Sequence, residues 1–297
     1  MQQELSIGEG VRLRRGAGDL DYLHVRAAGG SAMLSLQGAQ LLEYRSALSP
    51  EPLLWVSEAA EYRQGRPLRG GIPICWPWFG AHPDDAGAPA HGYARITPWT
   101  VHATERVDDV VVLVLRMSEP ACAPGPCWRA ELELRVEVGE SLRLRLRTRN
   151  LEPRPMRLTE ALHAYLRVGD VRRVRVRGLD AATSVDKLAG LRSEVHHGDL
   201  RFDGPIDRMF VGTPSSCVVE DPVLGRHIRI TKNGSASTVV WNPWQEGAAR
   251  MPDMAGAGWE RMLCVEAGNV ERDLITLLPG AEHELGAHYQ ALPSSGA

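Results

Sequence analysis

The sequence predicts an all-β protein, a large antiparallel β-sandwich with few short helices. Three observations support this fold class. Several segments alternate apolar and charged residues with a period of two; glycine and proline are frequent, with 30 Gly and 20 Pro in 297 residues; and amphipathic patterns with a helical period are scarce. Many short strands joined by turns fit these observations better than alternating strands and helices do.

The clearest predicted strand covers residues 142–149, where leucines alternate with arginines. Residues 131–138 alternate in the same way, and residues 173–177 repeat the pattern more briefly. Such alternation places apolar side chains on one face of a sheet and charged side chains on the other. Residues 110–117 are almost entirely apolar, which predicts a strand that is buried on both faces.

Shorter strands are predicted along the rest of the chain, at residues 11–14, 32–36, 216–220, 227–231 and 237–241. Turn signals separate them, such as Val-Gly-Glu at 138–140 and Lys-Asn-Gly at 232–234. The sequence contains no repeat and no long linker, so we expect one β-sandwich domain over residues 1–291. The last residues, 292–297, predict a disordered tail.

The composition excludes several classes of function. The 34 Lys and Arg against 37 Asp and Glu give a net charge of −3, which provides no electrostatic reason to bind nucleic acid. No apolar run approaches the roughly 20 residues of a membrane span, and the start of the chain lacks the apolar segment of a signal peptide. The cysteine count is odd, with 5 residues and no CxxC pair. We therefore expect a cytoplasmic protein, without a membrane or nucleic-acid partner, and monomeric because nothing indicates an obligate interface.

An aromatic-rich segment at residues 69–80 reads RGGIPICWPWFG and differs from a plain strand. Trp76, Trp78 and Phe79 could form an apolar platform for the C–H face of a sugar. The alternative is that these rings close one end of the sandwich, as large aromatic residues usually do.

Arg69 and Arg95 bracket this segment, the second within HGYAR at residues 91–95. An arginine can hold a phosphate through two parallel hydrogen bonds. All but two of the 34 basic residues are arginines, however, so a surface position is the alternative for either one.

Two further segments each place one ionisable residue in an apolar context. His163 lies within the apolar stretch 161–166, and Glu266 follows a buried-strand pattern at 263–265. A histidine in a partly dry pocket is suited to proton transfer near neutral pH, although it could also be a satisfied core residue. A carboxylate that ends an apolar run is either one half of an ion pair or a general base.

Five stretches, in this order along the chain, resemble the aldose 1-epimerase superfamily, and specifically its hexose-6-phosphate mutarotase branch (glucose-6-phosphate 1-epimerase). They are RGGIPICWPWFG at 69–80, HGYAR at 91–95, EALHAY at 160–165, VVWNPW at 239–244 and MLCVEAGNV at 262–270. The Arg-Gly-Gly-Ile-Pro run is more typical of the phosphosugar branch than of galactose mutarotases.

The resemblance implies an isomerase with an antiparallel β-sandwich, an open groove and no cofactor, which interconverts the α and β anomers of an aldohexose 6-phosphate in carbohydrate metabolism. It also implies roles for six residues: general acid for His163, general base for Glu266, sugar positioning for His91, phosphate or hydroxyl recognition for Arg69 and Arg95, and a sugar-hydroxyl contact for Asp207. One departure concerns residues 81–90, which contain no aromatic residue, Lys or Arg. A phosphate grip that needs a basic residue there would be absent from this chain.

These residue types also fit the chemistry. Opening a cyclic hemiacetal removes a proton from the anomeric hydroxyl and delivers one to the ring oxygen. A carboxylate and an imidazolium suffice when each lies within about 3 Å of its proton partner. The acid should have a pKa near or above 7, which a nearby carboxylate would favour. Neither step needs a metal or a nucleophile, so we expect Cys75 and Cys264 to be structural.

Three alternatives stay open. His91, His163 and Glu266 together could bind a metal as two imidazoles and one carboxylate, although their spacing does not fix two ligands on one element. The HxD spacings at 82–84 and 197–199 lie among turn residues, which favours solvated loops. A Trp-rich groove could belong to a sugar-binding module without catalytic activity. The substrate could also be a neutral aldose such as galactose or glucose, which the phosphate dependence of activity would decide.

Overall fold

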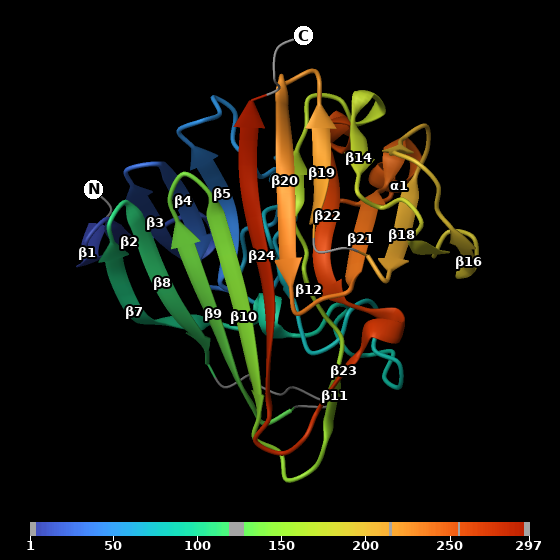
Figure 1. Cartoon of the computed structure of the whole chain (residues 1–297). Coiled ribbons are helices and arrows are strands. Elements are labelled where there is room, and N and C mark those ends of the chain that lie inside the picture. Colours follow the sequence, from blue (N-terminus) through green and yellow to red (C-terminus); the bar gives the residue numbers. More distant parts are fainter. Residues whose placement is uncertain (1–3, 119–127, 214–215, 255, 294–297) are drawn as a thin grey trace.

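The computed structural model describes residues 4–118, 128–213, 216–254 and 256–293. Strands in antiparallel sheets dominate these residues, which confirms the predicted all-β class (Figure 1). The helices are short: α1 (Trp244–Ala249) and the 3-10 helices η1 (Ala17–Asp19), η2 (Ala94–Ile96), η3 (Val171–Arg173), η4 (Gly256–Arg261) and η5 (Glu271–Asp273). Within the described part of the chain, no helix has the length and apolar character that crossing a membrane requires.

The largest sheet contains nine strands and forms one layer of the sandwich. Its strands are, in spatial order, β17 (Leu200–Arg201), β14 (Arg175–Arg177), β19 (Ser216–Asp221), β20 (Arg226–Asn233), β24 (Glu282–Pro293), β10 (Leu142–Asn150), β9 (Ala130–Val138), β8 (Val110–Met117) and β7 (Trp99–Val107).

Two sheets form the opposite layer. The five-stranded sheet is a simple meander of β1 (Glu4–Gly8), β2 (Val11–Arg15), β3 (Asp21–Ala27), β4 (Gly30–Ser35) and β5 (Gln40–Ser46). The eight-stranded sheet has the order β16 (Arg192–Val195), β15 (Thr183–Asp186), β18 (Ile206–Val211), β21 (Ser237–Asn242), β22 (Met262–Asn269), β12 (Glu160–Leu162) and β6 (Ile74–Cys75), and β13 (Tyr165–Arg167) also pairs with β22. A small separate sheet joins β11 (Met156–Leu158) to β23 (Ile275–Leu277).

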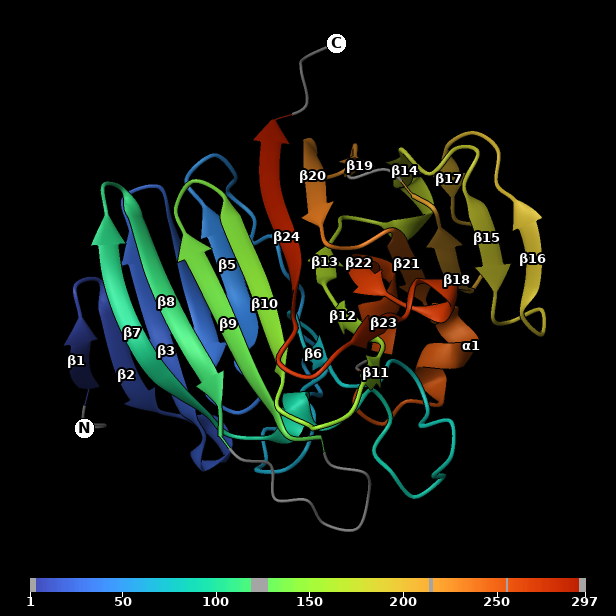
Figure 2. The same cartoon turned by 60° about the horizontal axis from the view of Figure 1, so that its bottom comes forward.

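The nine-stranded sheet spans both halves of the opposite layer. Figure 2 shows β3 and β5 behind β7–β10, with β1 and β2 at the outer edge, and the strands around β22 beyond β24 on the other side. Contacts agree with this view, since β3 packs on β8 and β9, while β22 packs on β24. Buried apolar residues from all three large sheets form one continuous core, which therefore supports the eight-stranded sheet from behind.

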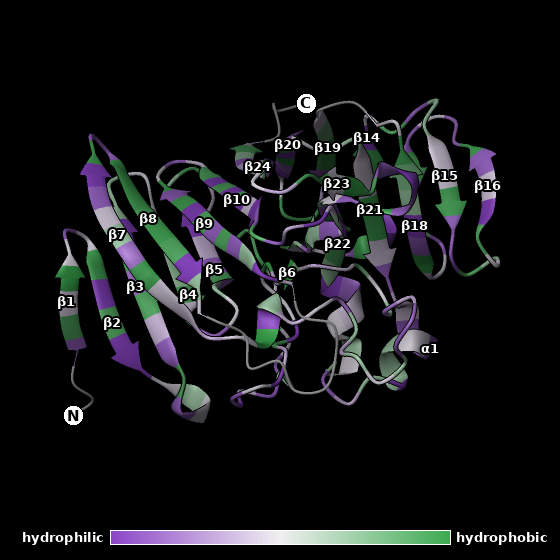
Figure 3. Cartoon of the chain, turned by 90° about the horizontal axis from the view of Figure 1, so that it is seen from below, coloured by the Kyte–Doolittle hydropathy of each residue, from purple (hydrophilic) through white to green (hydrophobic). Residues whose placement is uncertain are grey.

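The predicted alternation of buried apolar and exposed charged side chains is found in the strands. In β10, Leu144 and Leu146 are buried, whereas Arg147 points outward and pairs with Glu133 of β9 at 3.1 Å. Figure 3 shows the resulting hydrophilic and hydrophobic bands along β9 and β10. The prediction of burial on both faces also holds at the start of β8, where residues 111–113 are all buried.

Two predicted boundaries differ from the structure. The predicted strand at 173–177 is wrong at its start, because the Asp170 side chain accepts a hydrogen bond from the Arg172 backbone N–H and caps η3. The strand β14 begins only at Arg175. Strand β24 extends to Pro293, so it includes the first two residues of the predicted tail, whereas 294–297 lie outside the described residues. The expectation of a single domain stays a prediction.

Free, buried thiols are found at Cys75, Cys217 and Cys264, which agrees with the expectation that Cys75 and Cys264 are structural. The cysteines at 122 and 127 lie outside the described residues.

Candidate active site

One face of the eight-stranded sheet collects most of the predicted site residues. Cross-strand pairing aligns Glu266 of β22 with Val239 of β21, and Trp241 of β21 with Asp207 of β18. Because side chains alternate along a strand, Glu266 and Asp207 project from the same face, opposite to the core. We call this surface the site face.

His163 reaches Glu266 across a break between two short strands. Strand β12 ends at Leu162, which pairs with Ala267, and β13 begins at Tyr165, which pairs with Cys264. The pairing leaves His163 opposite Glu266, with its backbone N–H donating to the Pro73 carbonyl at 3.0 Å. The two predicted acid–base residues therefore meet, with His163 Nδ1 3.3 Å from Glu266 Oε1.

Both side chains are almost completely excluded from solvent, and both favour the uncharged form. Burial, followed by the charge of Asp207, raises the pKa of Glu266 well above its ordinary value. Burial, followed by His91 and the charges of Arg95 and Arg69, lowers the pKa of His163 well below its ordinary value. The expected upward shift of the histidine pKa is thus wrong for the protein without substrate.

The pair nevertheless holds one proton in either of two charge states. A neutral carboxyl beside a neutral imidazole holds the same number of protons as a carboxylate beside an imidazolium. Neither oxygen of Glu266, nor Nδ1 of His163, has a hydrogen-bond partner among the described residues. Buried polar atoms without partners are rare in folded proteins, and a ligand that supplies the partners is one explanation.

His91 lies beside this pair in an unusual backbone conformation. Its φ is +63°, and its backbone N–H donates to the Gly80 carbonyl at 2.6 Å. Its Nδ1 accepts the Gly80 N–H at 3.2 Å, which leaves the proton of the neutral ring on Nε2. Burial, followed by nearby cations, lowers its pKa to about 3, so His91 is a neutral hydrogen-bond donor. Its ring lies 5.6 Å from that of His163.

Tyr165 connects His163 to a charged pair. The Tyr165 ring stacks on the imidazole of His163, with centroids 4.8 Å apart and planes 12° from parallel. Arg69 donates from Nη1 to the Tyr165 hydroxyl at 3.1 Å, and from Nε and Nη2 to the two carboxylate oxygens of Asp253. Sequence reasoning identified neither Tyr165 nor Asp253, because neither stands out by type or spacing.

Two features fix the backbone around Arg69: the close approach of Gly71 to the neighbouring chain, and hydrogen bonds from the buried side-chain amide of Gln40. Gly71 has a φ of +64°, and a Cβ atom there would lie 2.0 Å from the Leu41 carbonyl oxygen. Gln40, which is fully buried, donates from Nε2 to the carbonyls of Leu68 and Gly70 on either side of Arg69. The glycine therefore permits the chain to pass here, and Gln40 holds it.

Arg95 lies in η2 and comes close enough to act on the same histidines. Its Nη2 donates to the Ala90 carbonyl at 2.6 Å, whereas its Nε is buried without a hydrogen-bond partner. Its charge lowers the pKa of both His163 and His91. Both predicted arginines thus belong to the site region.

Asp207 has a partner that sequence reasoning missed. Lys187 Nζ lies 2.9 Å from Asp207 Oδ2 and 5.6 Å from the centre of the Phe79 ring. One signal was available, since Lys187 is one of only two lysines in a chain whose other basic residues are arginines.

A cavity of about 790 Å³ opens next to this pair. Its walls include Trp78, Phe79, Lys187 and Met209. Trp76 is instead fully buried and donates from Nε1 to Thr148 Oγ1 at 3.1 Å, so the core alternative is right for that ring. The other two aromatic residues of the segment line the cavity.

The charges around the acid–base pair are arranged by sign. Arg69 and Arg95 act on His163, whereas Asp207 and Lys187 act on Glu266. The histidine end of the site therefore carries the Arg69–Asp253 ion pair and one further cation, Arg95, whereas the glutamate end carries the Lys187–Asp207 ion pair.

The donors closest to a metal-binding arrangement among the described residues are His163, Cys264 and Glu266, whose ligand atoms lie within 4.8 Å of one another. This set differs from the predicted alternative, because Cys264 takes the place of His91. Burial, followed by the charge of Glu266, raises the pKa of the Cys264 thiol well above its ordinary value. A protonated thiol and a protonated carboxyl are poor metal ligands.

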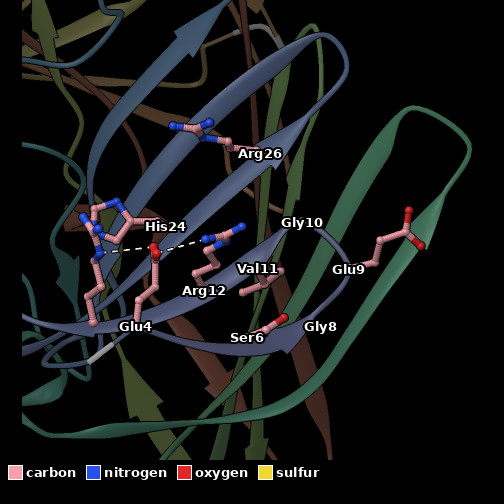
Figure 4. A pocket seen from close by; sticks show the side chains of 10 residues that line it. Glu4, Ser6, Gly8, Glu9, Gly10, Val11, Arg12, His24 and Arg26 are labelled. Carbon is pink, nitrogen blue, oxygen red and sulfur yellow. Dashed lines mark hydrogen bonds and ion pairs between the residues drawn. The ribbon is translucent and has the colours of Figure 1, made fainter. Parts of the chain in front are cut away.

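A different cavity, of about 440 Å³, lies on the five-stranded sheet (Figure 4). Its charged side chains pair with one another: Glu4 contacts Arg12 at 2.9 Å and Arg14 at 3.1 Å. None of the six predicted site residues lines this cavity or the 790 Å³ cavity. The candidate site is placed instead by the meeting of His163 and Glu266 on the eight-stranded sheet.

Comparisons with known proteins concern the chain as a whole. The aldose 1-epimerase family model matches residues 22–290. A protein of Cenchrus ciliaris named "Putative glucose-6-phosphate 1-epimerase" is 34% identical over 276 residues, which cover 89% of this chain and 82% of that protein. A Salmonella typhimurium protein with the same name is 33% identical over 259 residues, which cover 86% and 85%. The crystal structure of "a putative mutarotase (YeaD)" from Salmonella typhimurium has a TM-score of 0.90 and 29% identity, covering 98% of this chain and 97% of the other.

Proposed function

Because this chain belongs to the aldose 1-epimerase family, we propose that it interconverts the α and β anomers of a hexose 6-phosphate, and that glucose 6-phosphate is its substrate. The observation that carries the proposal is the buried pair of His163 and Glu266 beside two arginines. The names of the relatives from Cenchrus ciliaris and Salmonella typhimurium support the choice of sugar. We expect the protein to act as a cytoplasmic monomer without a cofactor.

In the proposed mechanism, His163 and Glu266 exchange protons with the sugar at two atoms. Glu266, as carboxylate, removes the proton of the anomeric hydroxyl, while His163, as imidazolium, protonates the ring oxygen and the C1–O5 bond breaks. After rotation about the C1–C2 bond, the aldehyde is attacked from its other face and both protons return. The pair holds one proton in total, so at every stage one residue can act as the acid and the other as the base, as the cycle requires. His91, a neutral donor, hydrogen-bonds the sugar from Nε2.

The phosphate group would bind at the cationic end of the site. In a hexopyranose 6-phosphate, C6 bears the phosphate and is bonded to C5, which carries the ring oxygen. Because His163 protonates the ring oxygen, the phosphate lies on the His163 side. Arg95 and Arg69 are the cations there, and Asp253 already pairs with Arg69. A phosphate dianion would offset their charge and thereby raise the pKa of His163, which favours the imidazolium that the reaction needs.

The test is anomer exchange measured by NMR with glucose 6-phosphate and, as control, free glucose. We expect strong acceleration for the phosphosugar and little for glucose. Arg69→Met should lower kcat/KM for glucose 6-phosphate by about 100-fold, because a charged hydrogen-bond donor to the phosphate is lost. Arg167 lies two residues after Tyr165, the hydroxyl partner of Arg69, and Arg167→Met, which removes an ion pair with Glu51, is the matched control.

Each of the other results has a definite meaning. Equal acceleration of both sugars would retain the acid–base mechanism and replace the substrate by a neutral aldose. No acceleration of either sugar by a folded sample would overturn the enzyme proposal and favour a sugar-binding module.

A further inference from the structure

The pair of Lys187 and Asp207 lies on the site face but has no part in the mechanism above. The Lys187 backbone N–H donates to the Asp207 carbonyl at 2.9 Å, which continues the pairing of β15 with β18 by one residue. Val185 pairs with Met209 two residues away, and Met209 lines the cavity. Alternation along both strands therefore directs Lys187 and Asp207 toward the same space.

The neighbouring residues provide an internal comparison. Asp186 and Arg208 form the adjacent cross-strand pair, with Arg208 Nε 3.0 Å from Asp186 Oδ2. They project from the opposite face of the sheet. The two ion pairs have similar exposure, since Lys187 is 33% exposed and Arg208 28%. They differ in the face that they occupy, which makes one a control for the other.

The charge of Lys187 affects two site residues. Its charge acts on both Glu266 and His91, and its ammonium lies over Phe79, whose ring centre is 4.9 Å from that of His91. In the proposed function, Glu266 takes the proton of the anomeric hydroxyl at C1. The closest other hydroxyl of the sugar is then the one on C2.

We propose that Lys187, held by Asp207, binds the C2 hydroxyl of the substrate and selects the configuration at C2; this inference rests on the proposed function. An ammonium group has three N–H donors, and the ion pair with Asp207 uses one of them. Asp207 can in turn accept the hydrogen of the same hydroxyl. A compact ammonium suits a single hydroxyl, whereas the planar guanidinium of Arg69 or Arg95 matches a phosphate. The arrangement thus assigns hydroxyl recognition to the lysine and phosphate recognition to the arginines.

Two substrates separate this role from a general effect on Glu266. Glucose 6-phosphate carries the C2 hydroxyl, and 2-deoxyglucose 6-phosphate lacks it. We expect Lys187→Met to lower kcat/KM about tenfold for the first and less than twofold for the second, because the charged hydrogen bond exists only with the first. Arg208→Met should leave both values within twofold. Both activities are measured as anomer exchange over a pH series.

The pH series identifies an indirect role. Without Lys187, Asp207 is unopposed and raises the pKa of Glu266 further, which shifts the activity profiles of both substrates to higher pH by the same amount. An equal loss with both substrates at the plateau would overturn the proposal while leaving the proposed function intact. If the wild-type protein accelerates exchange of neither phosphosugar, the proposed function itself fails, and this inference fails with it.

Discussion

Two Glu–His pairs with buried carboxylates lie on opposite faces of the eight-stranded sheet, and their difference indicates which one is functional. On the site face, His163 Nδ1 is 3.3 Å from Glu266 Oε1; on the core face, His283 Nε2 is 3.2 Å from Glu160 Oε1. Both carboxylates are essentially inaccessible to solvent. Distance and burial of the carboxylate therefore do not distinguish the two pairs.

The hydrogen bonds and charges around the two Glu–His pairs distinguish them. Asn269 donates from Nδ2 to Glu160 Oε1 at 3.1 Å, so only one oxygen of Glu160 lacks a hydrogen-bond partner among the described residues, whereas both oxygens of Glu266 lack one. Burial lowers the pKa of His283, but the hydrogen bond and charge of Glu160 outweigh it, and the net shift is upward. Burial, followed by His91 and the charges of Arg95 and Arg69, shifts the pKa of His163 downward instead. The core pair is stabilised as an ion pair, whereas the site pair is left ready to exchange its proton with a ligand.

The largest difference in activity between the two pairs is expected from replacing each glutamate by glutamine. Glu266→Gln should reduce anomer exchange about 10³-fold, because it removes the general base. It should not lower the melting temperature: a carboxyl with a raised folded pKa costs stability as soon as the unfolded chain ionises, above about pH 4.5. Glu160→Gln should retain activity within a few-fold and lower the melting temperature, because His283 loses its charge partner. NMR exchange and thermal unfolding of both variants measure this.

Two results would contradict this assignment of roles. If Glu160→Gln abolishes exchange in a folded protein while Glu266→Gln does not, the functional pair is on the core face. If Glu266→Gln unfolds the protein, its carboxyl is structural, and the raised pKa does not describe it.

A smaller contrast concerns stability against pH. The folded pKa of His283 is raised, so its contribution to stability is fully present below the unfolded value near 6.5 and is lost as the pH rises through the folded value. His283→Gln should therefore lower the melting temperature more at pH 6 than at pH 9, by roughly 2–4 °C. The folded pKa of His163 is lowered, so the unfolded chain takes up the proton first, and wild type loses stability as the pH falls below 6.5. His163→Gln should reduce that acid-side loss.

The measurement is thermal unfolding of wild type and both variants from pH 5 to 9. Equal displacement of all three curves at every pH would show that neither histidine has a shifted pKa in the folded protein.

The sequence predicted strands well where the two faces differ in polarity. Residues 142–149 alternate without interruption and correspond to β10. Strand β24, the longest, escaped prediction because its middle, Leu285 to Ala287, is buried without alternation and contains a glycine. Its identity as a strand is set by the two neighbours that it pairs with, β10 and β20, which are distant in the sequence.

The site was predictable only in part for a similar reason. His163 and Glu266 were recognisable because a polar residue in an apolar run is unusual and because the surrounding motifs resemble a family. Lys187 lies in a polar turn and acquires its place only through the pairing of β15 with β18. The direction of the pKa shift of His163 was also wrong, because its burial is the largest cause of the downward shift, followed by His91 and the charges of Arg95 and Arg69, and the sequence does not position these groups.

The smallest effect is expected at Cys264, and it separates acid–base chemistry from a metal site. Cys264 lies next to the site pair, yet its thiol is held protonated by burial and by Glu266. Cys264→Ala should change anomer exchange by less than about twofold, as should Cys75→Ala, the buried control on β6, since neither thiol takes part in proton transfer. Dialysis against a chelator should likewise leave the rate unchanged. A metal bound by His163, Cys264 and Glu266 would instead make both Cys264→Ala and the chelator strongly inhibitory while Cys75→Ala stayed active, and readdition of the metal would restore the chelated sample but not the variant.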